Sequence, residues 1–231
     1  MQTLYEKLET NDELNRKLFD GDKLKEDVRE RAIEIAQFFA EESLVPIDIL
    51  DVLLVGSNAS YNYTEQSDFD LHIVTNFEFM DASEEILRAV FDSEKGRFRD
   101  AYEITIKGIP VEIYVQDIES SVNSNGVYSI MEDGWIKYPE KIEIPKYQYF
   151  ETDLRNQMDE ITKILATNDA ETIKNKLNQL YLMRKNSIAA DGEFGEGNLI
   201  FKELRNLGYK DKLVNRLHEL TGRDLTLESF V

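Results

Sequence analysis

The sequence contains no cysteine, only two histidines, little positive charge and no long hydrophobic run. Without cysteine there is no disulfide, no thiolate nucleophile and no cysteine zinc site. The two histidines are His72 and His218, so a histidine-rich metal cluster is excluded and a Ser-His-Asp triad would have to use one of them. Asp and Glu number 46 against 27 Lys and Arg, a formal net charge of -19. Because phosphate backbones are bound through lysine and arginine, we expect no extended nucleic-acid surface.

The distribution of apolar residues argues against a membrane protein. No stretch approaches the roughly 18 consecutive apolar residues that cross a bilayer. The first twelve residues are polar and acidic, whereas a secretory signal is basic and then apolar. We therefore expect a cytoplasmic protein without a membrane partner, which agrees with the absence of cysteine.

Basic residues gather in two places that are candidate RNA contacts or ordinary solvated side chains. They are Lys95, Arg97 and Arg99, and the group Lys202, Arg205, Lys210 and Lys212.

Hydrophobic periodicity divides the chain into an α+β part, residues 1–145, and a helical part, residues 146–231. A helical apolar stripe within residues 22–42 is followed by a buried strand at 49–55 and a second strand at 69–75. A short helix capped by Asp81 or Ser83 then precedes a hairpin of residues 102–107 and 111–116, joined through Gly108. The expected buried residues of this short helix are Ile86, Leu87, Val90 and Phe91. Four helical stripes follow from residue 150, with Gly208 and Gly222 as expected helix ends.

The segment around Asp68-Phe69-Asp70 carries the chemical signal. Successive strand side chains alternate faces, so Asp68, Asp70 and His72 share one face while the apolar residues between them enter the core. Two carboxylates on one face repel each other when bare, and one would have to take up a proton. A divalent cation removes this cost, and Mg²⁺ favours a few carboxylates together with phosphate oxygens.

Glu112 is the best candidate for a third carboxylate. In Val111-Glu112-Ile113-Tyr114-Val115 the alternation separates apolar residues from Glu112, Tyr114 and Gln116. An acid between β-branched residues in a central strand is costly without a counter-ion. Glu103 and Asp117 are weaker alternatives, since one fits an outer hairpin strand and the other a strand end.

Gly56-Ser57 forms the second half of the candidate site. A glycine after a buried strand lets backbone amides approach phosphate oxygens. If Ser57 opens a short helix, its hydroxyl and the free amides there would bind an anion. We also assign Ser67, immediately before Asp68, to the nucleotide site.

The order of an apolar strand, Gly-Ser, ten residues and Asp-apolar-Asp resembles the signature of the DNA polymerase beta superfamily of nucleotidyltransferases. The match covers residues of about 52 to 116. The resemblance implies that Gly56 and Ser57 bind the triphosphate of an NTP such as ATP. It further implies that Asp68, Asp70 and Glu112 are catalytic and ligate two Mg²⁺ ions, which Mn²⁺ can replace. The third position is often aspartate in the superfamily, so Glu112 departs from its pattern.

The resemblance also implies an architecture and a reaction. We expect a nucleotidyltransferase fold, a mixed β-sheet flanked by helices, followed by a C-terminal helical bundle that closes over the nucleotide. The sequence of the whole chain also resembles those of small nucleotidyltransferases carried by bacteriophages. The reaction would transfer a nucleoside monophosphate to an acceptor hydroxyl and release pyrophosphate, and the acceptor could be a small molecule, an RNA end or a protein hydroxyl.

Arg184 interrupts an apolar helical stripe and allows two interpretations. Its stem can cover apolar surface at the edge of the stripe. Alternatively Arg184, together with Lys185, projects into the cleft and neutralises the triphosphate, and on that basis we include both as nucleotide-binding residues.

Two other functions compete with this interpretation. A nucleotide-sugar glycosyltransferase also uses an Asp-x-Asp metal site, but there the apolar run normally precedes the acids and Gly56-Ser57 would have no role. A non-catalytic nucleotide sensor should have lost a carboxylate, and none of the three is missing.

Overall fold

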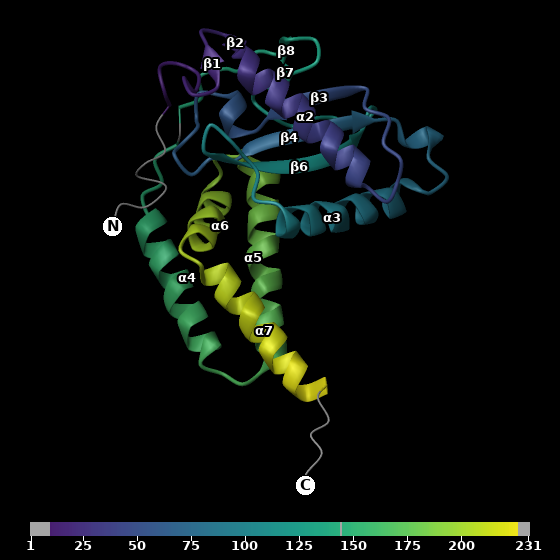
Figure 1. Ribbon diagram of the computed structural model, residues 1–231. Helices are drawn as coiled ribbons and strands as arrows, with labels where there is room; N and C mark the ends of the chain where they lie inside the picture. The colour runs from purple at the N-terminus through teal and green to yellow at the C-terminus, as the bar shows by residue number, and fades with distance from the viewer. Residues whose placement is uncertain (1–9, 144, 226–231) are drawn as a thin grey trace. The chain divides into compact units, whose positions relative to one another are not determined.

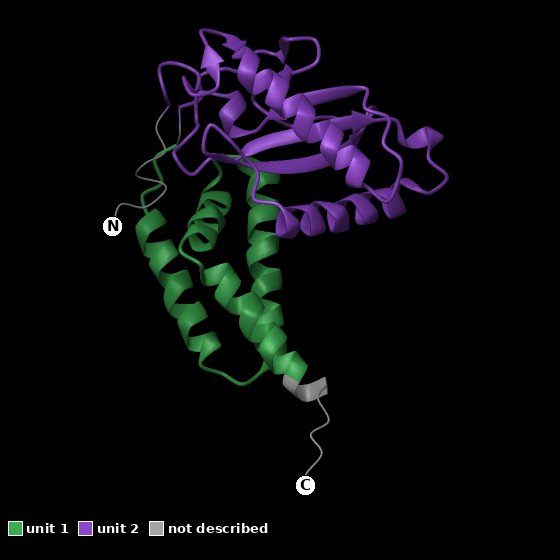
Figure 2. Cartoon of the chain, viewed as in Figure 1, with its two compact units in different colours: residues 1–7, 144–231 green, residues 8–143 purple. Residues whose placement is uncertain are grey.

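The computed structural model describes residues 10–143 and 145–225. The chain divides into two compact units, one of residues 8–143 and one that contains the helices from residue 150 onward (Figure 2). Residues 1–9, 144 and 226–231 of the two expected domains lie outside the described residues, and the assignment of catalysis to residues 1–145 stays a prediction.

The first unit is built on a six-stranded mixed sheet, which confirms the expected α+β class (Figure 1). β4 and β6 are parallel and the other neighbouring strands are antiparallel. In spatial order the strands are β5 (Thr105–Ile106), β6 (Ile109–Asp117), β4 (Phe69–Thr75), β3 (Asp51–Val55), β7 (Val127–Ser129) and β8 (Gly134–Lys137). A separate antiparallel pair consists of β1 (Phe19–Asp20) and β2 (Lys23–Leu24).

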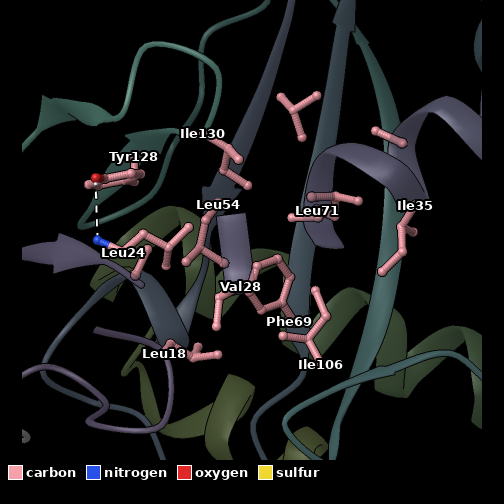
Figure 3. Packing of buried hydrophobic residues seen from close by; sticks show 14 of the residues in the cluster. Leu18, Leu24, Val28, Ile35, Leu54, Phe69, Leu71, Ile106, Tyr128 and Ile130 are labelled. Carbon is pink, nitrogen blue, oxygen red and sulfur yellow. Dashed lines mark hydrogen bonds between the residues drawn. The ribbon is translucent and has the colours of Figure 1, made fainter. Parts of the chain in front are cut away.

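Helix α2 (Glu26–Glu42) crosses one face of this sheet and buries its apolar stripe there (Figure 1). Val28, Ala32, Ile35, Ala36 and Phe39 are all buried, as the periodicity predicts. Alternate residues of β3 and β4 meet this stripe, so one face of the sheet is hydrocarbon (Figure 3). The hydroxyl of Tyr128 lies within this core and accepts a hydrogen bond from the Leu24 amide at 3.3 Å.

Helix α3 (Glu84–Ala101) runs between β4 and β6 in the sequence and packs against β6. Ser83 caps it by accepting a hydrogen bond from the Ile86 amide at 3.4 Å. The helix is longer than predicted, and Ile86 is 56% exposed instead of buried because it lies in the first turn, away from the face formed by Leu87 and Phe91. Since α3 extends to residue 101, the outer hairpin strand shrinks to Thr105–Ile106.

The second unit is helical, as predicted. Its helices are α4 (Phe150–Leu165), α5 (Ala170–Asp191), α6 (Glu196–Asn206) and α7 (Tyr209–Leu225). Gly208, with φ +75°, follows α6 as a left-handed residue. The expectation that Gly222 ends the last helix is wrong, because α7 continues through it at the modest cost of about 1 kcal/mol that helices tolerate for an interior glycine. Within the described ranges, no helix combines the length and the apolar character needed to cross a membrane.

Candidate active site

The polar face of the sheet brings two of the predicted acids next to each other. In the parallel register of β4 and β6, Asp70 is the partner of Glu112 and His72 is the partner of Tyr114. All four are only partly buried, whereas the residues between them on β4 face the hydrocarbon core. The expected alternation of both strands is therefore present. Parallel pairing is made possible by the long connection that contains α3.

Gly56 lies directly against Asp70. Val55 is the β3 partner of Asp70, so the turn that leaves β3 begins beside the carboxylate. Gly56 has φ +71°, and a Cβ atom at this position would overlap the Oδ2 atom of Asp70. Only glycine combines this backbone conformation with so close an approach. The Gly56 amide donates to the Ser124 hydroxyl at 3.0 Å. The backbone amide of this turn is therefore directed at an oxygen acceptor.

Ser57 opens a single 3₁₀ turn, Ser57–Ala59, and not the longer helix that an anion site at a helix end would need. Its hydroxyl donates to the Ser67 hydroxyl at 2.8 Å, which connects two of the predicted nucleotide-binding residues. Asn58 is fully buried, and its amide group donates to the carbonyl oxygens of Ser67 and Asp68. This amide group therefore fixes the turn after β3 to the residues that enter β4.

Tyr114 and Lys95 both contact the Glu112 carboxylate. The Tyr114 hydroxyl donates to Glu112 Oε2 at 2.7 Å, and the Lys95 ammonium of α3 lies 3.4 Å from the same oxygen. Burial lowers the pKa of Lys95, while the charges of Glu112 and Asp70 act in the opposite direction. The pKa of His72 is lowered chiefly by burial, and its Nδ1 atom contacts Gln116 Oε1 at 2.5 Å. Burial therefore favours the neutral form of the His72 imidazole.

The donor set suits Mg²⁺ at the Asp70–Glu112 pair, because this ion is usually held by one or two carboxylates together with substrate phosphates and water. Asp68 immediately precedes β4, and its backbone carbonyl is held by Asn58. Among the described residues, no three acidic or imidazole side chains form a ready-made metal-binding group. Joint ligation of two ions by Asp68, Asp70 and Glu112 therefore stays a prediction.

The two alternatives to Glu112 have other environments. Asp117 is buried and accepts hydrogen bonds from the amides of Phe77 and Glu119, each at 2.7 Å, so it organises the end of β6. Glu103 is exposed in the connection between α3 and β5. Glu112 is thus the acid of the three that pairs with Asp70 across the sheet.

Arg184 and Lys185 belong to α5 in the helical unit. The guanidinium carbon of Arg184 lies 5.1 Å from the ring centroid of Phe201 on α6, which is the packing expected for an arginine at the edge of an apolar stripe. A role of either residue in nucleotide binding stays a prediction.

Three further residues at the site carry little sequence signal. The sequence places Lys95 in a basic cluster with Arg97 and Arg99, but the three side chains have different partners in the structure. Arg97 donates to the Glu42 carbonyl and Arg99 to Asp100. Asn58 follows the Gly-Ser pair directly, and this adjacency is the only sequence clue to its role. Ser124 comes from a polar loop that no periodicity connects to Gly56.

Comparison with known proteins gives little similarity. No family model matches the chain, and no curated protein matches it at a significant level. Among solved structures, the c-UMP-AMP synthase CdnE of Rhodothermus marinus, determined with Apcpp and Upnpp, is similar at 17% identity. The match covers 90% of this chain and 86% of that chain, with a TM-score of 0.27. That TM-score is too low to establish a common fold.

Proposed function

We propose that this chain is a divalent-metal-dependent nucleotidyltransferase that transfers a nucleoside monophosphate from an NTP to an acceptor hydroxyl. The observation that carries the proposal is the pairing of Asp70 with Glu112 on the polar face of the sheet, with the Asp70 carboxylate packed against Gly56. Carboxylates beside a glycine turn provide what this chemistry needs, a place for cations and a place for phosphate oxygens.

In the proposed reaction, the acceptor oxygen forms a bond to the α-phosphorus and the bond between this phosphorus and the bridging oxygen to the β-phosphate breaks. Pyrophosphate leaves, and the proton of the acceptor hydroxyl passes to the Glu112 carboxylate. Tyr114 orients this carboxylate through its hydroxyl. Positioning and charge neutralisation supply most of the rate enhancement in such transfers.

Each residue of the site has a defined part in this proposal. Asp68, Asp70 and Glu112 would hold two Mg²⁺ ions, or Mn²⁺ in their place, which neutralise the phosphates and favour departure of pyrophosphate when bound. Gly56, Ser57 and Ser67 would contact the triphosphate at the turn. Arg184 and Lys185 are further proposed nucleotide-binding residues.

The acceptor belongs to one of three classes, a small alcohol, a protein hydroxyl or an RNA 3′ end. The strongly negative charge of the chain favours a small alcohol over an RNA 3′ end, because a polyanion is repelled unless local basic residues compensate.

The test is transfer of label from each α-labelled NTP, with Mg²⁺ or Mn²⁺, to pooled cell RNA, protein extract and small alcohols. The parent should label one fraction, and Asp70→Asn should lower labelling by at least about a hundredfold, since it removes a carboxylate that carries the metal charge. Asp100→Asn, at the exposed end of α3, is the matched control and should label like the parent.

Equal labelling by the parent and by Asp70→Asn would contradict the proposal. Circular dichroism and thermal melting of both variants establish that any loss comes from the carboxylate and not from unfolding. Release of free sugar or a sugar conjugate from nucleotide-sugar donors would instead support the glycosyltransferase alternative.

A further inference from the structure

Lys95 occupies an unusual position for a lysine. Its ammonium lies 3.4 Å from Glu112 Oε2 and 3.2 Å from the ring centroid of Tyr114, whose hydroxyl donates to that same oxygen. The Lys95 side chain is only 21% exposed and that of Glu112 is 32% exposed. Lysine normally keeps its ammonium in water, so this placement costs desolvation that the surrounding negative charge must offset.

The negative charge around Lys95 comes from both strands and from its own helix. Glu112 on β6 is the nearest carboxylate, and Asp70 on β4 and Asp92 on α3 also attract the ammonium. The π face of Tyr114 adds a cation–π contact from β6. A compact, tethered positive charge therefore already offsets part of the negative charge of the carboxylate pair to which the proposed function assigns a divalent cation.

A tethered ammonium and a divalent ion at one carboxylate pair repel each other. At an effective dielectric constant of about 20, charges about 5 Å apart interact strongly enough to change an affinity by a factor of ten or more. A divalent ion that binds without a nucleotide must therefore displace the Lys95 ammonium from the carboxylates, and the displaced ammonium gains no new anionic partner. An ion that arrives with a triphosphate brings negative oxygens with which a displaced lysine can pair.

We propose that Lys95 is a tethered cation that holds the Asp70–Glu112 pair and makes binding of the divalent ion depend on the nucleotide. This inference rests on the proposed function, because it assumes that the pair binds a metal ion. Lys95 acts through Glu112 and Asp70 and is thus a positioning residue. Because coupling between two ligands is reciprocal, the metal ion should raise the affinity for the nucleotide by the same factor.

The test is a titration with Mn²⁺ followed by electron paramagnetic resonance, with and without a non-hydrolysable α,β-methylene NTP analogue. Lys95→Met should bind Mn²⁺ alone about tenfold more tightly than the parent. With the analogue present, this difference should shrink to about threefold or less, because the parent then gains the nucleotide-linked affinity. Lys95→Arg keeps the charge and should behave like the parent.

Two further variants complete the experiment. Lys23→Met removes a lysine that pairs with Asp133 in the same unit, and it should leave both Mn²⁺ titrations unchanged. Asp70→Asn should lose Mn²⁺ binding under both conditions. Lys95→Gln provides a second neutral side chain in case Lys95→Met does not fold, and it should show the same tightening of Mn²⁺ binding without nucleotide.

The outcomes separate the two proposals. If the parent binds Mn²⁺, Asp70→Asn does not, and the neutral Lys95 variants bind it no more tightly than the parent, the inference on Lys95 is overturned and the metal site stands. If the parent and Asp70→Asn show the same Mn²⁺ response, the metal site is absent, and both the proposed function and the inference are overturned.

Discussion

The two faces of β4 differ in the interactions that determine which residues occupy them. On one face Phe69, Leu71 and Ile73 are fully buried beneath α2. On the other face Asp70 and His72 lie beside Glu112 and Tyr114 of β6. The hydrocarbon face is determined by local alternation, because burial of any apolar side chain stabilises it. The polar face depends on which charges other elements bring to it, as Lys95 of α3 shows.

Gly56 is the position at which the polar face is most sensitive to a small change. Gly56→Ala places a methyl group in the volume of the Asp70 carboxylate, so we expect transfer activity and Mn²⁺ affinity to fall by at least about a hundredfold through the displacement of a reacting group. Gly108→Ala is the matched control. Gly108 has a similar φ of +79°, but no atom lies within 4 Å of an added Cβ.

Both glycine variants should lose about 1–3 kcal/mol of stability to backbone strain, measured by chemical denaturation, because L residues are disfavoured at the positive φ that both positions adopt. Only Gly56→Ala should lose the activity measured with labelled NTP. Parallel losses in the two variants would mean that the polar face does not depend on the contact between Gly56 and Asp70.

The hydrocarbon face should dominate stability. Leu71 is fully buried, and Leu71→Ala should lower the free energy of unfolding by about 3 kcal/mol through lost burial and the cavity left behind. Gln116→Ala on the polar face removes the contact with His72 and should cost about 1 kcal/mol or less. Urea denaturation of both variants measures the contrast, and similar costs would show that the polar face contributes as much to folding as the core.

The hydrocarbon face also contains a hydroxyl with a predictable pH dependence. Burial and the hydrogen bond to Asp133 raise the pKa of Tyr128 to about 12, from an ordinary value of 10.0. The folded state therefore keeps this proton between pH 10 and 12 while the unfolded state loses it, so stability falls as the pH rises through this range. Tyr128→Phe should show a shallower decline of its thermal midpoint between pH 10 and 12 than the parent.

Local sequence patterns predicted most of the helices and strands, and they predicted that Asp70 and Glu112 lie on the faces of their strands opposite the apolar residues. The β4 strand has the predicted bounds, and the stripe on α2 is buried at every predicted position. The alternation around Asp70 and Glu112 also holds in the register of the sheet. These successes share a cause, since a period of two or 3.6 residues directly reports which face of an element is buried.

What the patterns missed depends on distant partners. Lys95 has no sequence feature that distinguishes it from Arg97 or Arg99, because its role comes from a strand 17 residues later in the chain. The length of α3 and the exposure of Ile86 likewise follow from how the helix packs on β6 and not from propensity. Gly222 shows that a glycine signals a helix end only where the chain must also turn.

The parallel pairing of β4 with β6 has a consequence for the order in which the molecule assembles. β3 and β4 are antiparallel neighbours, and Asn58 in their connection donates a hydrogen bond to the Asp68 carbonyl. The segment with Gly56 and Asp70 can therefore form early, because its contacts are close in sequence. Glu112 joins only after the crossover through α3 has closed, and closing a longer loop costs more chain entropy. A nascent or partly folded chain would thus present the turn and Asp70 without the second carboxylate, and chemistry that needs both would begin only once β6 has paired with β4.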